Sequence, residues 1–300
     1  MKVVICDPVD DSVNDYFENS DKFTLVEAFE LPELENEISD ASFLIIRSGT
    51  TVTRELMEKG EQLLGVVRAG VGLDNVDLEA AEELGVEIQN TPEASTNAVA
   101  ELVVAHILAI FRTLPRADAA MKQGEWIKKQ VAGCEIMNKT VGLVGYGRIG
   151  QRTGELLAGF GAKIIAYDEY VDDNVIKENG AQPVDLESII TDSDIISLHV
   201  PLTAETKDLF STPEFKKMKE SAIIVNCSRG GIINEDALNE ALSNGDIYGA
   251  GLDTYTEEPP GELAVLSNSK LVATPHLGAT TSEAQARIAR LIIDKIEAMA

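Results

Sequence analysis

The sequence predicts an α/β fold with parallel sheets, and two observations support this prediction. Short runs rich in β-branched residues recur along the 300 residues, and most are continuously apolar, as strands buried on both faces must be. Stretches with apolar residues at helical spacing lie between these runs. Strands that alternate with helices in this way are typical of parallel sheets covered by helices on both sides.

The expected elements follow one another along the whole chain. The expected strands are 3–6, 43–46, 65–67, 86–88, 140–144, 164–167, 195–200, 222–226 and 271–274. The clearest expected helices between them are 55–64, 78–84, 149–160 and 235–242. The longest expected helix is 95–114: its first residues, Ser-Thr-Asn, can cap the first turn, and Pro115 follows its end. Its apolar density fits a domain or subunit contact and an ordinary core helix equally well.

The chain is strongly acidic, with 51 Asp and Glu against 25 Lys and Arg and a formal net charge of −26. This charge repels phosphate backbones and anionic lipids, so nucleic acids and membranes are not expected partners. The apolar stretch 98–111 is shorter than the roughly 20 residues of a membrane span, and residues 1–12 lack the apolar core of a signal peptide. Three cysteines without paired spacing predict reduced thiols and a cytoplasmic location.

A glycine-rich loop follows one of the apolar strands. Gly145, Gly147 and Gly150 form a GxGxxG pattern that directly precedes an expected helix. In dinucleotide sites the first glycine allows a tight turn, the second lets the backbone approach the pyrophosphate, and the third lets helix and strand pack closely. The helix amino terminus, with Arg148 and Ile149, then supplies N–H groups to the phosphates. The pattern predicts a dinucleotide site.

Asp168 ends the next expected strand, about 20 residues after the glycine loop, where an acid can accept hydrogen bonds from the adenosine ribose. The five residues after it include no base. A carboxylate here repels the 2′-phosphate of NADP, whereas NADP sites tend to have an arginine nearby. The sequence therefore favours NAD as the cofactor.

Several motifs, taken together, carry a family resemblance. Besides the glycine loop they are RAGVGLDNVD (68–77), NTPEAST (90–96), NCSRGGIINEDAL (226–238), GLDTYTEEPP (251–260) and TPHLGAT (274–280). In their order and spacing they resemble the D-2-hydroxyacid dehydrogenase family, most closely its phosphoglycerate dehydrogenases in a short form without a C-terminal regulatory domain.

The resemblance implies two doubly wound parallel-sheet domains. A flavodoxin-like substrate domain would comprise residues 1–94 and 281–300, and a Rossmann NAD-binding domain would be inserted at 95–280. Members of the family are usually homodimers, so a homodimer is expected.

The resemblance assigns the catalytic roles to Arg229, Glu258 and His276. The planar fork of an arginine can bind and polarise a 2-keto acid, and a histidine can exchange the proton of the alkoxide near neutral pH. A hydrogen bond from the imidazole to Glu258 would orient the ring. By contrast, His106 in the apolar helix is expected to be a packing residue. No metal-ligand spacing is present, so no metal is expected.

Further site residues follow from the same resemblance. Besides the glycine-loop residues and Asp168, the implied cofactor contacts are Val200, Cys227, Ser228, Arg229, Asp253, His276, Gly278 and Ala279, and His199, at a strand end beside Pro201, could line the same site. The implied substrate contacts are Arg47, Ser48, Gly49, Arg68, Ala69, Gly70, Val71 and Lys128. Asp253 matches the acid near the nicotinamide carboxamide, and core packing is an alternative role for the Cys227 side chain.

The expected reaction is the oxidation of D-3-phosphoglycerate to 3-phosphohydroxypyruvate, which begins serine biosynthesis. Arg47, Arg68 and Lys128 could offset the substrate's phosphate, although Lys128 fits a solvated turn nearly as well. The alternatives are a glyoxylate/hydroxypyruvate reductase or a D-lactate dehydrogenase. A different class, an NAD-sensing binding protein similar to corepressors, is disfavoured because the three catalytic residues occur together.

Overall fold

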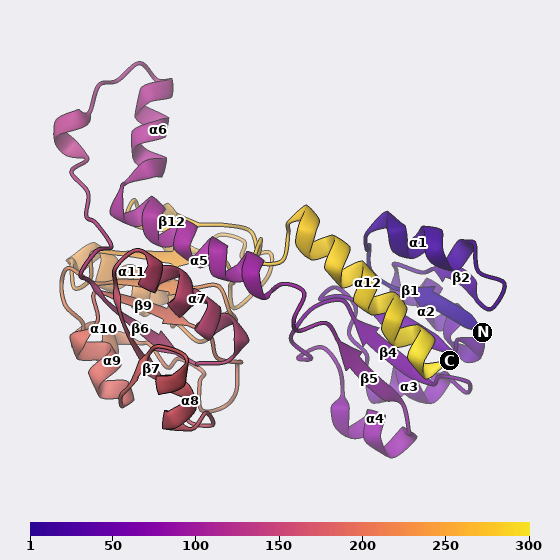
Figure 1. Ribbon diagram of the computed structural model, residues 1–300. Coiled ribbons are helices and arrows are strands. Elements are labelled where there is room, and N and C mark those ends of the chain that lie inside the picture. Colours follow the sequence, from indigo (N-terminus) through magenta and orange to yellow (C-terminus); the bar gives the residue numbers. More distant parts are fainter. The chain divides into compact units, whose positions relative to one another are not determined.

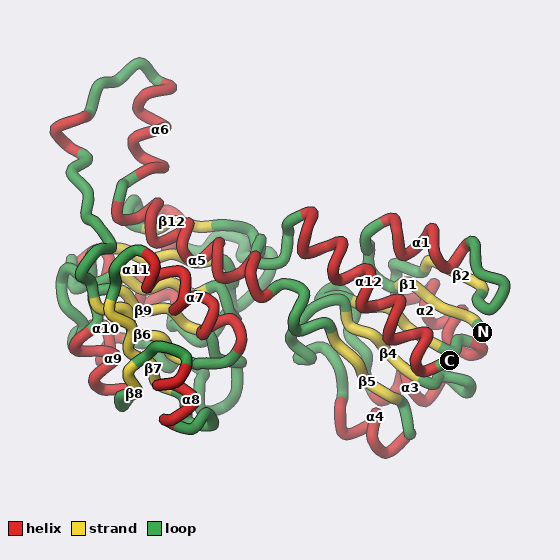
Figure 2. The backbone as a smooth tube through the Cα atoms, viewed as in Figure 1, coloured by secondary structure: helices red, strands yellow, loops and turns green.

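The computed structural model describes every residue from Met1 to Ala300 and divides into two compact units (Figure 1). Unit 1 comprises Met1–Ser95 and Ala279–Ala300, and unit 2 comprises Thr96–Gly278. Helices and strands alternate along the chain (Figure 2), and each unit holds one sheet in which all paired strands are parallel. The predicted α/β class with parallel sheets is confirmed.

Unit 1 contains a five-stranded sheet in the order β2-β1-β3-β4-β5. Its strands are Lys2–Ile5 (β1), Thr24–Glu27 (β2), Phe43–Ile46 (β3), Gly65–Arg68 (β4) and Glu87–Asn90 (β5). Its helices are Asp11–Glu18 (α1), Leu31–Glu37 (α2), Arg54–Lys59 (α3), Leu78–Leu84 (α4) and Ser282–Met299 (α12), with a short 3₁₀ turn at Ile38–Asp40 (η1). The strand order reverses between β1 and β3, and such switch points open a crevice at the carboxyl ends of the strands.

Alternate residues of the central strands pack on opposite faces of this sheet. Val4 and Leu44 join the cluster formed with α2, α3 and α4, whereas Val3 and Phe43 join the cluster formed with α1 and α12. Both faces are therefore apolar, which explains the continuous hydrophobic runs. The edge strand β2 is only partly buried and lacks such a run, so the sequence pattern did not reveal it.

Unit 2 contains a seven-stranded sheet in the order β12-β11-β10-β9-β6-β7-β8. Its strands are Thr140–Val144 (β6), Lys163–Tyr167 (β7), Gln182–Pro183 (β8), Ile195–Leu198 (β9), Ile223–Asn226 (β10), Gly249–Leu252 (β11) and Leu271–Ala273 (β12). Its helices are Thr96–Phe111 (α5), Leu114–Lys122 (α6), Arg148–Gly159 (α7), Asp173–Glu178 (α8), Leu186–Asp192 (α9), Thr212–Phe215 (α10) and Glu235–Asn244 (α11), with 3₁₀ turns at Lys128–Gln130 (η2) and Ala264–Ser267 (η3). The strand order reverses between β6 and β9.

Helix α5 lies unusually close to β11 because two glycines face it. A Cβ on Gly249 would lie 2.8 Å from Cγ2 of Ile110, and a Cβ on Gly251 would lie 2.8 Å from Nδ1 of His106. These distances are shorter than ordinary van der Waals contact. The two glycines thus allow a buried helix carrying a histidine to pack directly on the sheet.

The expected helix 95–114 is shorter in the structure, and α6 begins soon after it. The chain breaks at Thr113, whose φ is 51°, and Pro115 lies in the first turn of α6 rather than beyond a helix end. Proline suits a first turn because its missing N–H would have no partner there. No single helix is long and apolar enough to cross a membrane, and α5 and α6 reach that length only as a pair bent by 64°.

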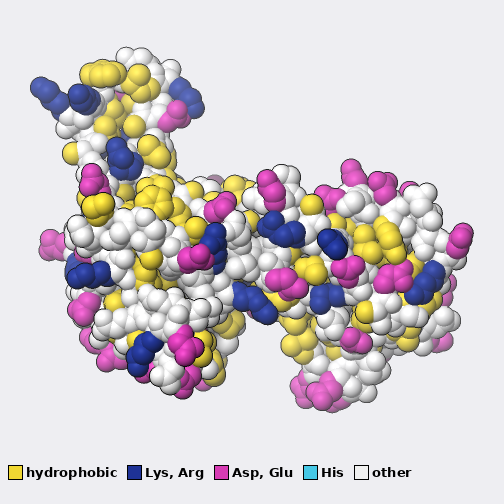
Figure 3. All heavy atoms as spheres, viewed as in Figure 1, with side chains coloured by type: hydrophobic (Ala, Val, Ile, Leu, Met, Phe, Trp, Pro, Cys, Tyr) yellow, Lys and Arg dark blue, Asp and Glu magenta, His cyan; other side chains and the backbone are white.

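Residues 112–135, here called the arm, extend away from the body of unit 2 (Figure 1). Hydrophobic side chains lie on the surface of this arm (Figure 3), and Leu114, Met121 and Trp126 are 53%, 55% and 77% exposed. Its two limbs are linked by a hydrogen bond of 3.2 Å from Nη2 of Arg116 to Oε1 of Gln130.

Candidate active site

A histidine–glutamate pair lies at the carboxyl end of the sheet in unit 2. Nδ1 of His276 is 2.7 Å from Oε2 of Glu258, and the side chains are 43% and 36% exposed. The other carboxylate oxygen of Glu258 accepts a hydrogen bond of 3.1 Å from the Tyr255 N–H. With Nδ1–H donated to a carboxylate, Nε2 is the ring atom that can exchange a proton with a ligand.

The backbone at His276 is held in the left-handed region, with φ 54°. This conformation is costly for a residue with a side chain and needs support from its surroundings. Asp253, which is fully buried at the end of β11, supplies that support. Its Oδ1 accepts from the Leu277 N–H at 2.7 Å and its Oδ2 from the Gly278 N–H at 2.9 Å.

The Arg229 loop is shaped by Asn226 at the end of β10. Oδ1 of Asn226 accepts from the Ser228 N–H at 3.0 Å, and its amide donates to the Arg229 carbonyl at 2.7 Å. A Cβ on Gly230 would overlap the Tyr255 carbonyl, so this glycine lets the loop lie against the turn that carries Glu258. The structure therefore brings the Arg229 loop and the histidine–glutamate pair to the same edge of unit 2.

An apolar pocket of about 460 Å³ borders the pair. Its lining includes Pro259, Leu266 and Tyr255, whose hydroxyl donates to the Thr274 carbonyl at 2.9 Å. Burial raises the pKa of Tyr255 to about 12, so its hydroxyl remains a neutral donor. Sequence reasoning missed Tyr255, Thr274 and Asn226, because their contacts are with other groups of the protein and only their places in the motifs signalled them.

The glycine loop fits the pyrophosphate of a dinucleotide. Gly145 has φ 92°, and a Cβ there would lie 2.6 Å from the His199 carbonyl oxygen. A Cβ on Gly150 would overlap the Gly145 carbonyl, whereas a Cβ on Gly147 would meet nothing within 4 Å. The first and third glycines are thus required by packing, and the second leaves open space at the amino terminus of α7, where no side chain caps the N–H groups.

Asp168 ties the end of β7 to the glycine loop. Its Oδ2 accepts from the Tyr146 N–H at 2.6 Å, and its Oδ1 accepts from the N–H groups of Tyr170 and Val171 at 2.9 and 3.1 Å. A carboxylate offers about four acceptor sites, so one remains for a ribose hydroxyl. The position fits the adenosine ribose of NAD.

His199 directly follows β9, and Cys227 directly follows β10. Nε2 of His199 lies 3.0 Å from the Ser197 hydroxyl, and burial lowers the pKa of this histidine to about 4, which keeps the ring neutral. The side chain of Val200 would lie 3.0 Å from a Cβ on Gly145. Cys227 is buried in the core cluster, and burial raises the pKa of its thiol well above the usual range. Its side chain is therefore a core residue, as the alternative interpretation held.

The predicted substrate loops of unit 1 follow neighbouring strands. Arg47, Ser48 and Gly49 follow β3, and Arg68 ends β4, which pairs with β3. Asp7, which the sequence analysis did not single out, holds the first loop: its Oδ2 accepts from the Arg47 N–H at 2.6 Å. An acid directly after the first buried strand was the available signal.

The second substrate loop, Arg68 to Val71, folds back on itself. The Ala69 N–H donates to the Ile46 carbonyl at 2.7 Å, and a Cβ on Gly70 would overlap the Arg68 guanidinium. Unit 1 therefore brings its two cation-bearing loops together at one edge of its sheet.

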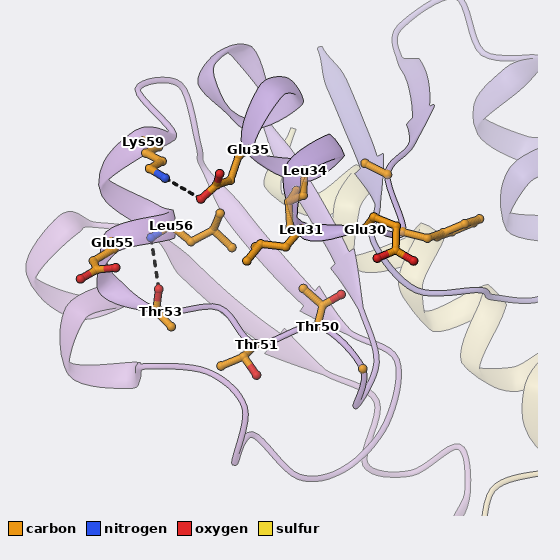
Figure 4. A pocket seen from close by; sticks show the side chains of 13 residues that line it. Glu30, Leu31, Leu34, Glu35, Thr50, Thr51, Thr53, Glu55, Leu56 and Lys59 are labelled. Carbon is orange, nitrogen blue, oxygen red and sulfur yellow. Dashed lines mark hydrogen bonds and ion pairs between the residues drawn. The ribbon is translucent and has the colours of Figure 1, made fainter. Parts of the chain in front are cut away.

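A pocket of about 390 Å³ lies beside Gly49, between α2 and α3 (Figure 4). Glu30, Glu35 and Glu55 line it, and the Lys59 ammonium is paired with Glu35 at 2.7 Å. Three carboxylates and one paired cation do not suit a phosphate. This pocket is therefore not suited to the substrate's phosphate, and Arg47 and Arg68 remain the predicted phosphate contacts of unit 1.

Lys128 lies in η2, within the arm that leaves the carboxyl end of α5 (Figure 1). The His276 loop packs at the opposite end of α5, since a Cβ on Gly278 would lie 3.2 Å from Val99. A helix of 16 residues is about 24 Å long. The structure therefore does not bring Lys128 beside the histidine–glutamate pair within one chain.

Comparison with known proteins identifies the family. Residues 104–278 match the model of the D-isomer specific 2-hydroxyacid dehydrogenase, NAD binding domain. The chain belongs to the D-isomer specific 2-hydroxyacid dehydrogenase family. The predicted resemblance and the NAD cofactor are confirmed, because residues 104–278 match the NAD-binding domain of this family.

Several relatives match this chain over nearly its full length. A D-3-phosphoglycerate dehydrogenase of Methanocaldococcus jannaschii is 41% identical over 99% of this chain and 57% of its own length. A hydroxypyruvate reductase of Thermotoga maritima is 41% identical over 98% of this chain and 97% of its own length. The solved D-lactate dehydrogenase of Aquifex aeolicus, complexed with NAD and lactic acid, has a TM-score of 0.89 at 27% identity, covering 99% of this chain and 95% of that one.

The chain spans about half the length of the phosphoglycerate dehydrogenases it matches, between 48% and 57% of each.

Proposed function

We propose that this protein transfers a hydride between NAD and a D-2-hydroxy acid or its 2-keto acid. The observation that carries the proposal is the hydrogen bond of 2.7 Å between Nδ1 of His276 and Glu258, in a unit that also holds a dinucleotide-type glycine loop. Bound NAD supplies the hydride acceptor, and NADH supplies the donor for the reverse reaction.

The residues of the site account for the remaining requirements. In oxidation the C–H bond at C2 breaks as the hydride leaves, while Nε2 of His276 takes the hydroxyl proton and a C2=O double bond forms. Glu258 keeps the imidazole oriented and stabilises its positive charge. Arg229 binds the substrate's carboxylate and polarises the carbonyl oxygen in the reverse reaction.

We infer that the cofactor contacts are the glycine-loop residues, Asp168 and the loops after β9, β10, β11 and β12. Asp168 has one acceptor site left for the ribose and repels a 2′-phosphate, so NADH should be preferred to NADPH. Asp168→Ala should narrow this preference by weakening NADH more than NADPH. Titration of each reduced cofactor by fluorescence measures the effect, and equal affinities in the wild type would contradict the assignment.

The substrate we favour is D-3-phosphoglycerate, oxidised to 3-phosphohydroxypyruvate at the start of serine biosynthesis. The support is the pair of arginine-bearing loops in unit 1 of an otherwise acidic protein, together with the similarity to phosphoglycerate dehydrogenases. A hydroxypyruvate reductase is the second candidate, because the Thermotoga maritima relative matches this chain over 97% of its length.

Rates with a substrate panel distinguish these candidates. D-3-phosphoglycerate should give a higher kcat/KM than glyoxylate, hydroxypyruvate or D-lactate in its own direction. If Lys128 reaches the site of the partner subunit in the inferred dimer, Lys128→Glu should raise KM for the phosphorylated acid and leave KM for glyoxylate nearly unchanged, whereas equal effects on both would remove Lys128 from the phosphate site. If the unphosphorylated acids are the better substrates, the reductase function replaces the dehydrogenase function.

We further infer a homodimer that forms through unit 2. The exposed apolar side chains of the arm support it, since surfaces of this kind mark protein contacts. Light scattering should give twice the chain mass for the wild type and the single mass for Trp126→Ser, with unchanged circular dichroism. A monomeric wild type would contradict the inference. The free cysteines Cys6, Cys134 and Cys227 fit the reducing cytoplasm in which we expect the dimer to act.

A further inference from the structure

His106 takes part in a hydrogen-bonded chain that ends at the His276 loop. Its Nε2 lies 2.9 Å from Oγ1 of Thr274, and that hydroxyl donates to Oδ1 of Asp253 at 2.6 Å. Asp253 in turn accepts from the N–H groups of Leu277 and Gly278. Only 2% of His106 is exposed, so this series of hydrogen bonds begins inside the protein.

The geometry fixes the tautomer of His106. The Thr274 hydroxyl has one proton, which it donates to Asp253, so it can only accept from His106. Nε2 therefore carries a proton. Nδ1 is buried without a protein hydrogen-bond partner and lies over Gly251, where a second proton would have no acceptor. Burial accordingly lowers the pKa of His106, and the ring is the neutral Nε2–H form.

The hydrogen bonds from His106 through Thr274 and Asp253 act on the backbone after His276 and do not contact a ligand directly. Asp253 must point both oxygens at the two N–H groups that follow His276, and the Thr274 hydroxyl fixes the rotation of this carboxylate. Without a donor at Nε2, the Thr274 hydroxyl loses the partner that aims its proton at Asp253. The left-handed conformation of His276 would then be supported less firmly.

We propose that His106 is a positioning residue: as a neutral donor it fixes Thr274 on Asp253 and thereby holds the backbone of His276 in place. That His276 exchanges the substrate proton rests on the proposed function, whereas the hydrogen-bonded chain and its effect on the loop do not. The role goes beyond the packing role predicted from the apolar helix.

Amide hydrogen exchange of the protein without ligand tests the proposal directly. His106→Leu keeps an apolar side chain of similar size but removes the donor. His106→Gln keeps a donor near the position of Nε2. Ile107→Ala, at a fully buried neighbour in α5, is the control for lost packing alone.

His106→Leu should lower the exchange protection of the Leu277 and Gly278 amides by roughly three- to tenfold relative to the rest of unit 2, about the effect of one net hydrogen bond. His106→Gln should restore most of it, and Ile107→Ala should lower protection throughout unit 2 without singling out these amides. Unchanged relative protection in His106→Leu, or a change spread as in Ile107→Ala, would overturn the proposal.

Kinetics provide the second measurement. His106→Leu should lower kcat by a similar factor, and His106→Gln should recover kcat, whereas an unchanged kcat in His106→Leu would count against positioning of His276. If the wild type turns over none of the hydroxy acids, the proposed function fails, but the exchange data still decide whether His106 holds the loop.

Discussion

Glu257 and Glu258 are adjacent residues and both are exposed, yet only Glu258 contacts His276. The difference arises because Oε1 of Glu258 is anchored by the Tyr255 N–H, which leaves Oε2 facing the imidazole. Because both oxygens of Glu258 are hydrogen-bonded, its side chain is fixed in one rotamer and can orient the His276 ring. Substitutions of Glu257 and Glu258 therefore offer a matched test of the mechanism.

Glu258→Gln should lower kcat by about 10²-fold or more, because the amide neither stabilises the charged imidazole nor enforces the same tautomer. Glu257→Gln should stay within about twofold of the wild type, as expected for an exposed substitution. Steady-state rates with NAD and the best hydroxy acid measure both. Equal losses in the two variants would show that loop charge, not the contact with His276, matters.

His199 predicts a pH dependence of stability. Its pKa is about 4 in the folded protein, below the ordinary 6.5, so the unfolded chain binds a proton first as pH falls. The free energy of unfolding should therefore fall between pH 6.5 and 4, by up to about 3 kcal/mol from this group.

The contribution of His199 is isolated by comparison with His199→Gln. Denaturant unfolding at several pH values should show the wild type losing stability relative to this variant as pH decreases. Parallel curves for the two proteins would mean that folding does not lower the pKa of His199.

The site residues that sequence could reveal are those whose side chains meet ligands, because their chemistry and motif spacing are visible in the chain. Glu258 and His276, predicted as partners from the resemblance, do meet in the structure. Asn226 and Asp7 were missed because their side chains bind backbone groups, and any loop can create such a contact. His106 was assigned to packing because nothing in its helix signals Thr274, which lies 168 residues away.

At the scale of elements, the turn from β6 into α7 separates the two functions of glycine. Gly147→Ala should leave the melting temperature nearly unchanged, since the added Cβ meets no atom, but should weaken NADH binding by about tenfold or more through overlap with the pyrophosphate. Gly150→Ala should destabilise the fold by about 1–3 kcal/mol, since its Cβ overlaps the Gly145 carbonyl.

Thermal unfolding and NADH titration of the two variants measure these effects. Unaltered NADH affinity in Gly147→Ala would mean that the cofactor does not approach this turn.

The strands and helices of the core were predictable because burial on both faces leaves an uninterrupted apolar run, as in β3 and β9. Strand β2, with one edge and a half-exposed pattern, has no such run. The break between α5 and α6 was also missed, because Pro115 was the signal for the helix end and the left-handed turn at Thr113 has no glycine. Local sequence patterns therefore predicted the buried strands and helices better than the edge strand and the break between two helices.

At the scale of the whole molecule, the net charge of −26 predicts a response to salt. Dense surface carboxylates repel one another until counterions screen them. The melting temperature should therefore rise between low and molar concentrations of potassium chloride. A charge that only maintains solubility gives a flat curve, and that result would remove the interpretation of a salt-adapted surface.

The central claim is that His276 exchanges the substrate proton in an NAD-linked oxidoreductase. The most direct measurement is the turnover of the wild type and of His276→Ala with NAD and D-3-phosphoglycerate, alongside the dissociation constant for NADH. Turnover should fall by about 10²–10⁴-fold while NADH affinity stays nearly the same. Undiminished turnover in His276→Ala would contradict the claim.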